Sequence, residues 1–412
     1  MLPPLSLYIH FPWCVRKCPY CDFNSYTLHG ELGEGPYLDA LARDLEAQAQ
    51  EVSGREVVSV FMGGGTPSLF SPAGIGRALE TARQHLVLAA DVEVTMEANP
   101  GTIERKRFED YRAAGVNRVS LGAQSFDSAQ LVALGRIHSS DETRRAANEL
   151  HEAGLSNFNL DLMYALPGQD VAGAIRDVEE ALRLDPAHLS HYQLTIEAGT
   201  VFAGKPPQLP EDDAAAEMLS ACRVRLAEKG FDQYEISAYA RESRQCRHNL
   251  NYWQFGDYVG IGAGAHGKIT YLGTAAPSGG GGGAPAPQAA SHGSLTIVRT
   301  QQTREPRRYL ADAVGQLVRK PIEPRELPFE FMLNALRLVE GFEVRSFHQR
   351  TGLEWSQIAP VVRQLQGRGL LIDDRGACRA SPLGLRFLND LLLSFLAETP
   401  KTSGSFGLST VA

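Results

Sequence analysis

Apolar residues along the first half of the chain fall into two alternating patterns. Short, nearly continuous apolar runs predict strands at 5–10, 57–62, 92–97, 118–121, 157–162 and 188–195. Between them apolar residues recur at spacings of three and four, as in Tyr37, Leu38, Leu41 and Leu45, which predicts amphipathic helices. Runs of this kind are typical of parallel strands that are covered on both faces. The pattern therefore predicts an α/β fold, a partial (β/α)6 barrel with its site at the carboxyl ends of the strands.

The rest of the chain divides into shorter predicted units. Residues 212–229 predict a helix and 231–239 a strand, whereas 275–293 are nearly all Ala, Gly, Pro and Ser, as in flexible linkers. Later apolar patterns predict helix, helix, short strand and helix at 329–338, 357–365, 369–373 and 383–396. We expect a partial barrel over 1–200, a barrel-associated extension over 201–274, a flexible insertion over 275–304, a small C-terminal winged-helix-like domain over 305–397 and a disordered tail over 398–412.

Composition and charge are those of an ordinary globular protein. The 412 residues are 43% hydrophobic and 21% charged, and the formal net charge is −8. This charge argues against a broad phosphate-binding surface, so we expect no nucleic-acid partner. The first residues lack the basic region and apolar run of a signal peptide, and no apolar stretch reaches the ~20 residues of a membrane span. We therefore expect a cytoplasmic protein.

Three cysteines follow the first predicted strand closely: Cys14, Cys18 and Cys21. Iron–sulfur clusters of the [4Fe–4S] type normally take four cysteine thiolates. Three thiolates on one loop leave one iron open to an outside ligand, and an open iron is a place for chemistry. The spacing C-x3-C-x2-C therefore predicts such a cluster at the carboxyl edge of the sheet.

Three other interpretations of these cysteines remain open. Structural zinc usually has four ligands, and His10 or His29 could supply the fourth, although neither has a usual spacing. A disulfide needs an oxidising compartment, and the cysteines could also be incidental. The remaining cysteines, Cys222, Cys246 and Cys378, are far apart, which is typical of buried small hydrophobic residues.

The second predicted strand runs into three glycines and Thr66, at 63–66, followed by Pro67. Consecutive glycines let a bound molecule approach the backbone closely. The segment is not a phosphate-binding P-loop, because no Gly-Lys-Ser/Thr sequence follows. A tight strand–helix turn capped by Ser68 is the alternative explanation.

Polar residues stand at or near the ends of the next predicted strands: Glu97, Gln124, Arg136 and Asp161. A single residue of this kind is usually a satisfied buried polar group. Four of them on successive units of one sheet edge instead predict a binding site. Carboxylates there could bind ribose hydroxyls or an ammonium group, and Arg136 could bind a carboxylate.

Two further sequences invite a functional interpretation. Residues 262–267 fit G-x-G-x-x-G, but a dinucleotide site needs a following helix, and here 268–272 predicts a strand, so we interpret the sequence as a turn near the sheet edge. His248 stands shortly before Tyr252 and Trp253. It is either a core histidine packed among rings or a haem-iron ligand whose neighbouring rings cover a flat macrocycle.

Together these motifs resemble a known family. The cysteine triad after a first strand resembles the radical S-adenosylmethionine (SAM) superfamily, and 63–67 resembles its glycine motif. The segments that resemble the subgroup around oxygen-independent coproporphyrinogen III oxidase are 14–26, 62–68, 97–100, 121–126, 161–169 and 248–253. The resemblance covers about residues 5–270 and extends to the C-terminal domain. It implies a radical SAM barrel.

The resemblance also implies a role for each motif residue. Cys14, Cys18 and Cys21 would hold a [4Fe–4S] cluster, whose open iron is chelated by the amino and carboxylate groups of SAM. The implied SAM contacts are Tyr8 and Tyr20 near the cluster, Gly64, Gly65 and Thr66 at the methionine part, Glu97 at the ribose, and Gln124, Arg136 and Asp161 in the same pocket.

Two positions depart from the oxidases of this subgroup. The oxidases carry a further cysteine two residues after the third, where this chain has Phe23, and they lack the His-Asn-x-x-Tyr-Trp sequence at 248–253. Both features resemble the HemW branch, whose members are described as haem chaperones. This resemblance implies haem as a third ligand with His248 as its contact, and no catalytic residue. The implied partners are an electron donor and haem-accepting proteins, for which membrane association is an option.

Two other functions stay open on the sequence alone. The runner-up is SAM-dependent oxidative decarboxylation of coproporphyrinogen III, against which Phe23 argues. The third is a barrel with a structural zinc site and a DNA-binding winged helix.

Overall fold

Parallel strands form the centre of the protein. The computed structural model describes residues 2–102, 107–273, 295–374 and 376–396. The six strands expected from the sequence lie side by side, each parallel to the next, and a further strand pairs in parallel with the first. The parallel strands are β1 (Leu5–Phe11), β4 (Glu56–Gly64), β5 (Val87–Ala98), β6 (Arg118–Gln124), β7 (Phe158–Tyr164), β8 (His188–Gln193) and β11 (Asp257–Ile261).

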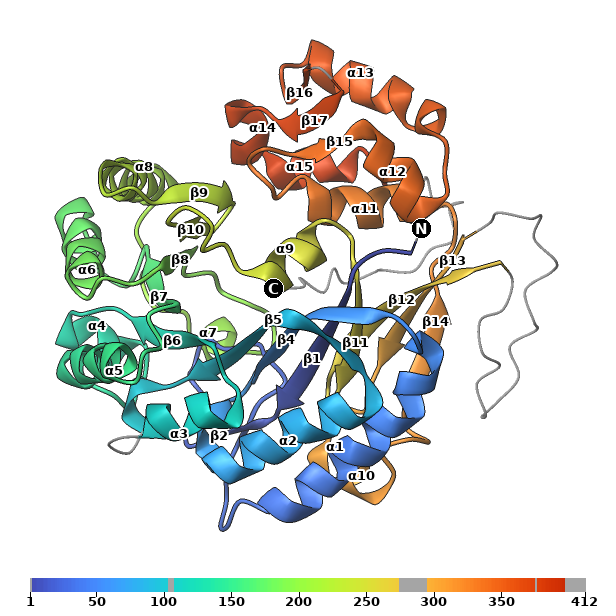
Figure 1. Cartoon of the computed structure of the whole chain (residues 1–412). Coiled ribbons are helices and arrows are strands. Elements are labelled where there is room, and N and C mark those ends of the chain that lie inside the picture. The colour runs from blue at the N-terminus through green and yellow to red at the C-terminus, as the bar shows by residue number, and fades with distance from the viewer. Residues whose placement is uncertain (1, 103–106, 274–294, 375, 397–412) are drawn as a thin grey trace.

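Antiparallel strands extend this sheet at both ends. They are β12 (His266–Leu272), β13 (Leu295–Gln301) and β14 (Val318–Pro321) beyond β11, and β10 (Ala238–Ala240) and β9 (Asp232–Glu235) beyond β8. The complete order is β14-β13-β12-β11-β1-β4-β5-β6-β7-β8-β10-β9, and the sheet curves into an incomplete barrel (Figure 1). The single strand expected at 231–239 is therefore a hairpin of two strands.

Two expectations about the β11 side are wrong. Residues 295–301, which the sequence analysis assigns to the flexible insertion, form β13 and pair with β12 along its whole length, because this β-branched stretch can complete the sheet. The glycine-rich turn after residue 261 joins two inner strands, β11 and β12, and so does not lie at the sheet edge. Residues 274–294 of the expected insertion and 397–412 of the expected tail lie outside the described residues.

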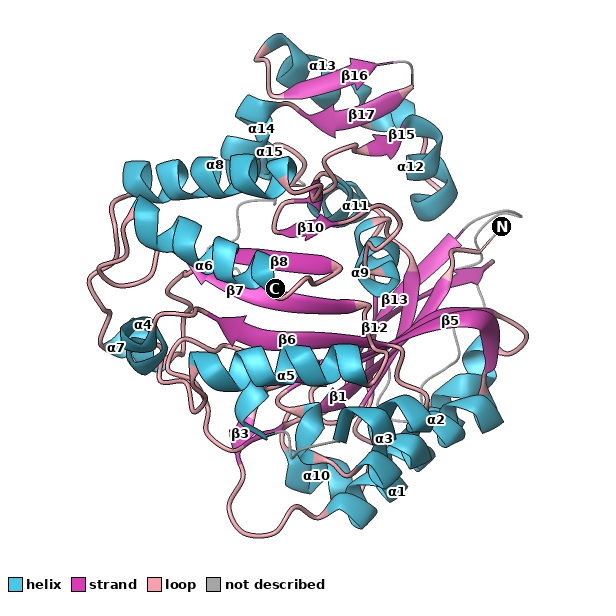
Figure 2. Cartoon of the chain, turned by 60° about the vertical axis from the view of Figure 1, so that its left-hand side comes forward, coloured by secondary structure: helices cyan, strands magenta, loops and turns pink. Residues whose placement is uncertain are grey.

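Helices cover the outer face of the parallel strands (Figure 2). The periodic segments of the sequence, such as 37–45, are confirmed as helices. In the described part of the chain no helix is both long and apolar enough to span a membrane. The helices of the barrel are α1 (Glu34–Ala49), α2 (Pro72–His85), α3 (Arg107–Ala114), α4 (Ser128–Ala133), α5 (Ser140–Glu152), α6 (Val171–Arg183), α7 (Val201–Gly204), α8 (Asp212–Glu228), α9 (Arg247–Trp253) and α10 (Pro306–Ala311), with 3-10 turns η1 (Gln50–Val52), η2 (Pro67–Leu69) and η3 (Pro100–Thr102).

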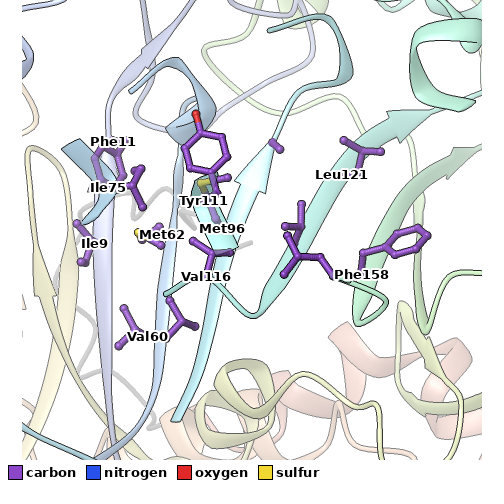
Figure 3. Close-up of a cluster of buried hydrophobic side chains, with 14 of the residues drawn as sticks. Ile9, Phe11, Val60, Met62, Ile75, Met96, Tyr111, Val116, Leu121 and Phe158 are labelled. Carbon is purple, nitrogen blue, oxygen red and sulfur yellow. The ribbon is translucent and has the colours of Figure 1, made fainter. Parts of the chain in front are cut away.

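Side chains alternate between two faces along each parallel strand. Those that point toward the helices are apolar and fully buried, among them Ile9, Val60 and Met62 (Figure 3). Those on the inner face are mostly polar; β1, for example, contributes Ser6, Tyr8 and His10. The expectation of strands covered on both faces is therefore met only in part. Helices cover the outer face, whereas on the inner face α9 packs against β1 and β4, and half-buried polar side chains such as Glu97 and Asp161 line the remainder.

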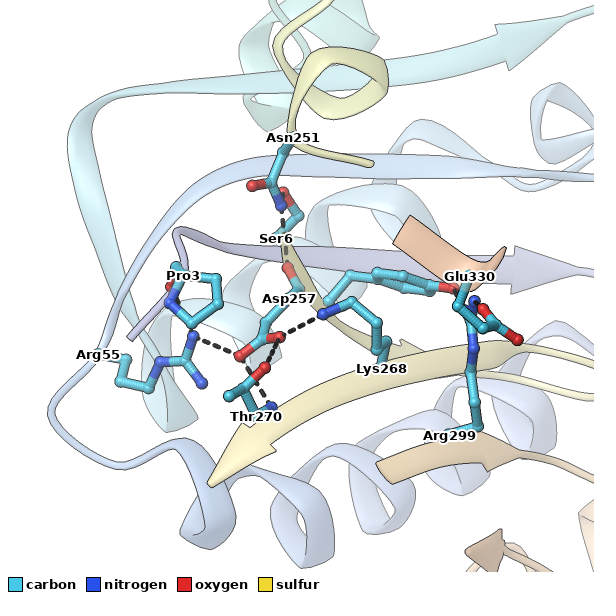
Figure 4. Close-up of polar contacts among 10 residues, drawn as sticks. Pro3, Ser6, Arg55, Asn251, Asp257, Lys268, Thr270, Arg299 and Glu330 are labelled. Carbon is cyan, nitrogen blue, oxygen red and sulfur yellow. Dashed lines mark hydrogen bonds and ion pairs between the residues drawn. The ribbon is translucent and has the colours of Figure 1, made fainter. Parts of the chain in front are cut away.

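A buried ion network fastens β11 to its neighbours. Asp257 accepts hydrogen bonds from Arg55 and Lys268, both at 2.8 Å, and from Thr270 (Figure 4). Burial alone would raise the pKa of Asp257, but Lys268 and Arg55 hold it below its usual value. Because each charge is paired and hydrogen-bonded, the network is tolerated inside the protein.

The C-terminal region builds a second core next to the barrel. Its strands form a small sheet in the order β15-β17-β16, and the sequence of elements is that of a winged helix. The single helix expected at 383–396 is broken in two at Phe387. The elements are α11 (Leu327–Ala335), β15 (Phe342–Glu343), α12 (Val344–Thr351), η4 (Trp355–Gln357), α13 (Ala359–Gly367), β16 (Leu371–Asp374), β17 (Ala377–Ala380), α14 (Pro382–Arg386) and α15 (Leu388–Leu393).

The boundary between the two cores is not sharp. Phe255 and Ile297 belong to barrel segments but pack in the C-terminal core, and Arg299 of β13 pairs with Glu330 of α11. We propose that the barrel and its extension continue through β13 and β14, and that the C-terminal domain begins at about residue 322, where its own core residues begin.

Candidate functional site

The cysteine loop leaves the carboxyl end of β1 and is closed by a short ladder. In this ladder β2 (Trp13–Cys14) pairs with β3 (Tyr26–Thr27). All three cysteines are free thiols and half-buried. Asn24, near the end of the loop, donates from Nδ2 to the carbonyl oxygens of Ala263 and Arg304, both at 2.9 Å. The turn between β11 and β12 thus holds the cysteine loop over the strand ends.

A cation lies directly beside the thiols. Arg136 donates from Nη1 to Cys18 Sγ at 3.4 Å and from Nη2 to the carbonyl of Gly122 at 2.8 Å. Burial raises the pKa of the Cys14 thiol, while hydrogen bonds from Thr66 and Ser25 oppose that rise. These donors and the guanidinium would stabilise thiolates, which are the form that binds iron.

The donor set fits a cluster better than a single metal ion. Among the described residues, no three His, Cys, Asp or Glu side chains converge on one metal position. A [4Fe–4S] cluster does not need such convergence, because each of the three thiolates binds a different iron.

Neighbouring protein atoms leave no room for a side chain at the glycines that end β4. Gly64 has a φ of +105°, and a Cβ there would lie 2.2 Å from the imidazole of His10. A Cβ on Gly65 would lie 2.6 Å from the carbonyl oxygen of Trp13. The N–H of Gly64 donates to Glu97 Oε2 at 3.0 Å. The motif therefore packs β4 against the cysteine loop and brings its backbone to the same edge as Glu97.

Glu97 and Asp161 form an acidic pair on the inner face. Burial, and secondly the charge of Asp161, raise the pKa of Glu97 to about 8, although the Gly64 N–H opposes this. Burial also raises the pKa of Asp161, against hydrogen bonds from Asn159 and Ser120. Both carboxyl groups remain half-buried, so a ligand with hydroxyl or cationic groups can reach them.

The other residues expected at the SAM site also gather at the strand ends. Tyr8 donates from its hydroxyl to His10 Nδ1 at 2.9 Å, and His10 Nε2 donates to the carbonyl of Asn24 at 2.9 Å. Tyr20, on the cysteine loop, has its ring 6.4 Å from that of Phe202. Gln124 ends β6 with a φ of +67°. This backbone conformation is strained for a residue other than glycine, and such strain is found mostly at functional sites.

His248 lies deeper in the barrel than these residues. Its ring centroid is 5.0 Å from Phe61 and 6.3 Å from Tyr8, and its Nδ1 lies 3.3 Å from Ser59 Oγ. Burial lowers its pKa to about 3, so the imidazole is neutral. The structure brings His248 onto the inner face, beneath Tyr8.

The two rings that follow His248, which the sequence analysis suggested as cover for a macrocycle, pack against other elements. Tyr252 packs 5.1 Å from Tyr258, and the guanidinium of Arg337 lies 4.3 Å over the ring of Trp253. Both rings therefore join α9 to neighbouring elements. Phe61 and Tyr8, which come from the parallel strands, are the rings beside the imidazole.

Several inner-face residues were not assigned to this site by the sequence analysis. They are His10, considered only as a zinc ligand, and Phe61, Arg118 and Tyr192, which lie on β1, β4, β6 and β8 respectively. Tyr8, Phe61, Glu97 and Asp161 are half-buried and Tyr192 is 41% exposed, so solvent reaches the inner face. The signal that could have found them is the polar residue at every second position of the strands, as in Ser6, Tyr8 and His10.

Comparisons with known proteins agree with this geometry. The family model described as the radical SAM superfamily matches residues 8–200, and the model described as the HemN C-terminal domain matches 322–387. Among solved structures, coproporphyrinogen III oxidase (HemN) from Escherichia coli is similar with a TM-score of 0.76 and 22% identity, covering 96% of this chain and 90% of that one. At this identity the likeness shows the fold alone.

Relatives of similar length are more informative. The heme chaperone HemW of Escherichia coli (strain K12) is 46% identical over 96% of this chain and 99% of its own. The heme chaperone HemW of Haemophilus influenzae is 41% identical with the same coverage. The mitochondrial radical S-adenosyl methionine domain-containing protein 1 of Bos taurus is 37% identical over 95% of this chain and 87% of its own. With such identity over nearly the full length of both chains, this protein belongs to the HemW family of radical SAM proteins.

Proposed function

We propose that this protein is a haem chaperone that binds a [4Fe–4S] cluster, SAM and haem and transfers haem to acceptor proteins. Bacterial relatives named heme chaperone HemW align with this chain over almost their whole length. The single observation that carries the proposal is the placement of a cysteine loop and of a neutral imidazole, His248, on the same solvent-accessible inner face.

Each expected contact has a place in this proposal. Cys14, Cys18 and Cys21 hold the cluster, and Arg136 balances the thiolate charge. The SAM contacts are Tyr8, Tyr20, Gly64, Gly65, Thr66, Glu97, Gln124, Arg136 and Asp161. When bound, the cluster supplies an electron and one open iron for SAM. His248 is the proposed haem contact.

The partners and the location are also part of the proposal. An electron donor would reduce the cluster, and the acceptors are haem proteins, for which membrane association is an option. We place the protein in the cytoplasm, because three half-exposed free thiols on one loop need a reducing compartment.

Haem titration of the anaerobically purified protein tests this function. We expect a Soret shift that saturates at one haem per chain, because the neutral imidazole of His248 can bind iron. His248→Ala should weaken haem binding at least tenfold, whereas His29→Ala, which changes an exposed histidine, should leave it unchanged. A protein that gives no saturable Soret shift would contradict the proposal.

SAM binding should depend on the ionisation of Glu97. The folded pKa of about 8 leaves most of this carboxyl protonated at pH 7. If the carboxylate accepts the ribose hydroxyls, SAM affinity rises as the pH is raised from about 6 through 8 and levels off above about 9. Calorimetric titration of SAM at several pH values measures this.

Glu97→Gln should remove most of this pH dependence and weaken SAM binding about tenfold, the equivalent of ~1.4 kcal/mol. Any pH dependence of SAM binding that remains in this variant would come from Asp161, whose pKa is also raised. Glu46→Gln, on the exposed face of α1, is the matched control. An unchanged pH profile in Glu97→Gln would remove Glu97 from the site.

A further inference from the structure

Arg118 carries a buried guanidinium for which the described residues supply no hydrogen-bond or ion-pair partner. It begins β6, and the residue is 2% exposed. Its Nε is fully buried and donates to no acceptor there. Across the described residues, no side-chain hydrogen bond or ion pair of Arg118 is found.

The nearest acidic groups are engaged elsewhere. Glu93 and Asp161 both act on Arg118 through their charges. Glu93 Oε1, however, accepts from the backbone N–H of Arg247 at 2.9 Å and of His248 at 3.3 Å. Asp161 accepts from Ser120 and Asn159. A buried guanidinium whose neighbours are already bonded is costly, unless an anionic ligand completes it.

A second polar group without a partner lies in the same row of the sheet. The strand register aligns Tyr8 with Phe61, Phe61 with Thr95, and Thr95 with Arg118. Thr95 Oγ1 is buried and has no hydrogen-bond partner. One row across four strands thus holds two rings, Tyr8 and Phe61, followed by two unsatisfied donors.

Arg118 and His248 face the same space. Glu93, which accepts from the His248 N–H at 3.3 Å, lies on β5 two residues before Thr95, and Thr95 pairs with Arg118. The charge of Arg118 accordingly contributes, after burial, to the lowered pKa of His248. His248 also lies beside Phe61 and Tyr8, the rings of the same row. An imidazole, two aromatic rings and an unpaired guanidinium therefore gather on one part of the inner face, where Tyr8 and Phe61 are the half-buried members.

We propose that Arg118 binds a carboxylate of a ligand inside the barrel, with Thr95 beside it. Two ligands of this protein carry a carboxylate, haem in its propionates and SAM in its methionine part, so the assignment rests on the proposed function. Arg118 stands at the amino end of β6 and Gln124 at its carboxyl end, which at ~3.3 Å per residue separates them by about 20 Å. SAM is expected at the carboxyl end. Arg118 shares its row with Tyr8, a proposed SAM contact, but His248, the proposed haem contact, packs against Phe61 of the same row. The distance from Gln124 and the nearness of His248 together favour a haem propionate.

Esterified haem tests the proposal without any substitution. The full-length protein with its cluster is titrated with haem and with haem dimethyl ester, in which both propionates are neutral. We expect haem to bind at least tenfold more tightly than the ester, because only haem offers Arg118 a charged carboxylate that can accept two parallel hydrogen bonds from the guanidinium. Equal affinities would overturn the assignment to a propionate.

Variants at Arg118 complete the test. Arg118→Gln should bind haem and its ester equally, Arg118→Lys should keep part of the preference, and Arg43→Gln, an exposed control on α1, should behave as wild type. A haem preference that survives in Arg118→Gln would contradict the proposal, and SAM affinity should stay unchanged in all three variants.

The SAM measurement distinguishes haem from SAM as the source of the carboxylate. It also distinguishes failure of the Arg118 site from failure of the proposed haem-chaperone function. If Arg118→Gln loses SAM affinity tenfold while the haem preference persists, the carboxylate is that of SAM. If wild type binds no haem, the proposed function fails, and the SAM titration alone then decides whether Arg118 is a carboxylate site. Unchanged SAM affinity in that case would overturn the site as well.

Discussion

Cys18→Ala is expected to abolish assembly of the [4Fe–4S] cluster. Anaerobic reconstitution of this variant should leave iron and acid-labile sulfide at background, whereas wild type should approach four of each per chain. The reason is geometric. Cys18 is the central thiol of the loop and the one that Arg136 contacts at 3.4 Å, so its loss leaves two thiolates and an unbalanced guanidinium.

Cys222→Ala is the matched control for that experiment. Cys222 is a fully buried cysteine of α8 and packs in the main core. Its replacement should cost about 1 kcal/mol of stability by removing a small buried group, and it should leave iron and sulfide at the wild-type level. Retention of both elements in Cys18→Ala at the wild-type level would contradict the assignment of the cluster to this loop.

Gly64→Ala is expected to lower the free energy of unfolding by about 3 kcal/mol, combining a strained φ with overpacking. The backbone at Gly64 has a φ of +105°, and the new methyl group would lie 2.2 Å from the ring of His10. Since His10 in turn holds the carbonyl of Asn24 on the cysteine loop, SAM binding should also be lost. Chemical denaturation and SAM titration measure the two effects.

A double variant separates the clash from the backbone strain. Gly64→Ala combined with His10→Ala removes the ring, so the two losses of stability should not add, and at least ~1 kcal/mol should be recovered relative to their sum. Gly204→Ala is the control, because no atom lies within 4 Å of a Cβ at that position. Additive losses would show that the His10 contact is not what requires glycine at residue 64.

The local parts of the site followed from the sequence. The cysteine loop follows β1, and the glycine motif forms the end of β4 and the residues just after it, so their place at the strand ends depends only on short-range chain geometry. Glu97 ends its strand in the same way, and Asp161 lies within β7. Parallel strands bring their carboxyl ends to one edge whatever the details of packing, and this is why residues more than 60 positions apart could be assigned to one site.

The residues of the inner face could not be predicted from the sequence in the same way. Strands such as β1 look almost uniformly apolar because Tyr8 counts as hydrophobic and Ser6 is small, yet alternate residues point away from the helices. Whether such a face meets a second helical layer or a ligand depends on how the whole sheet curves. Curvature arises from contacts between strands, as β11 shows by pairing with β1 from 250 residues away in sequence.

By itself the sequence determined six of the parallel strands, the helices between them and the family, because these depend on local periodicity and on motifs of adjacent residues. Only the tertiary structure decided that β11 and β13 belong to the sheet, that Phe61 and Tyr8 rather than Tyr252 and Trp253 lie beside His248, and that Arg118 has no partner among the described residues. Pairing and burial are properties of distant segments brought together, and the free energy of a buried charge depends on neighbours that no short stretch of sequence contains.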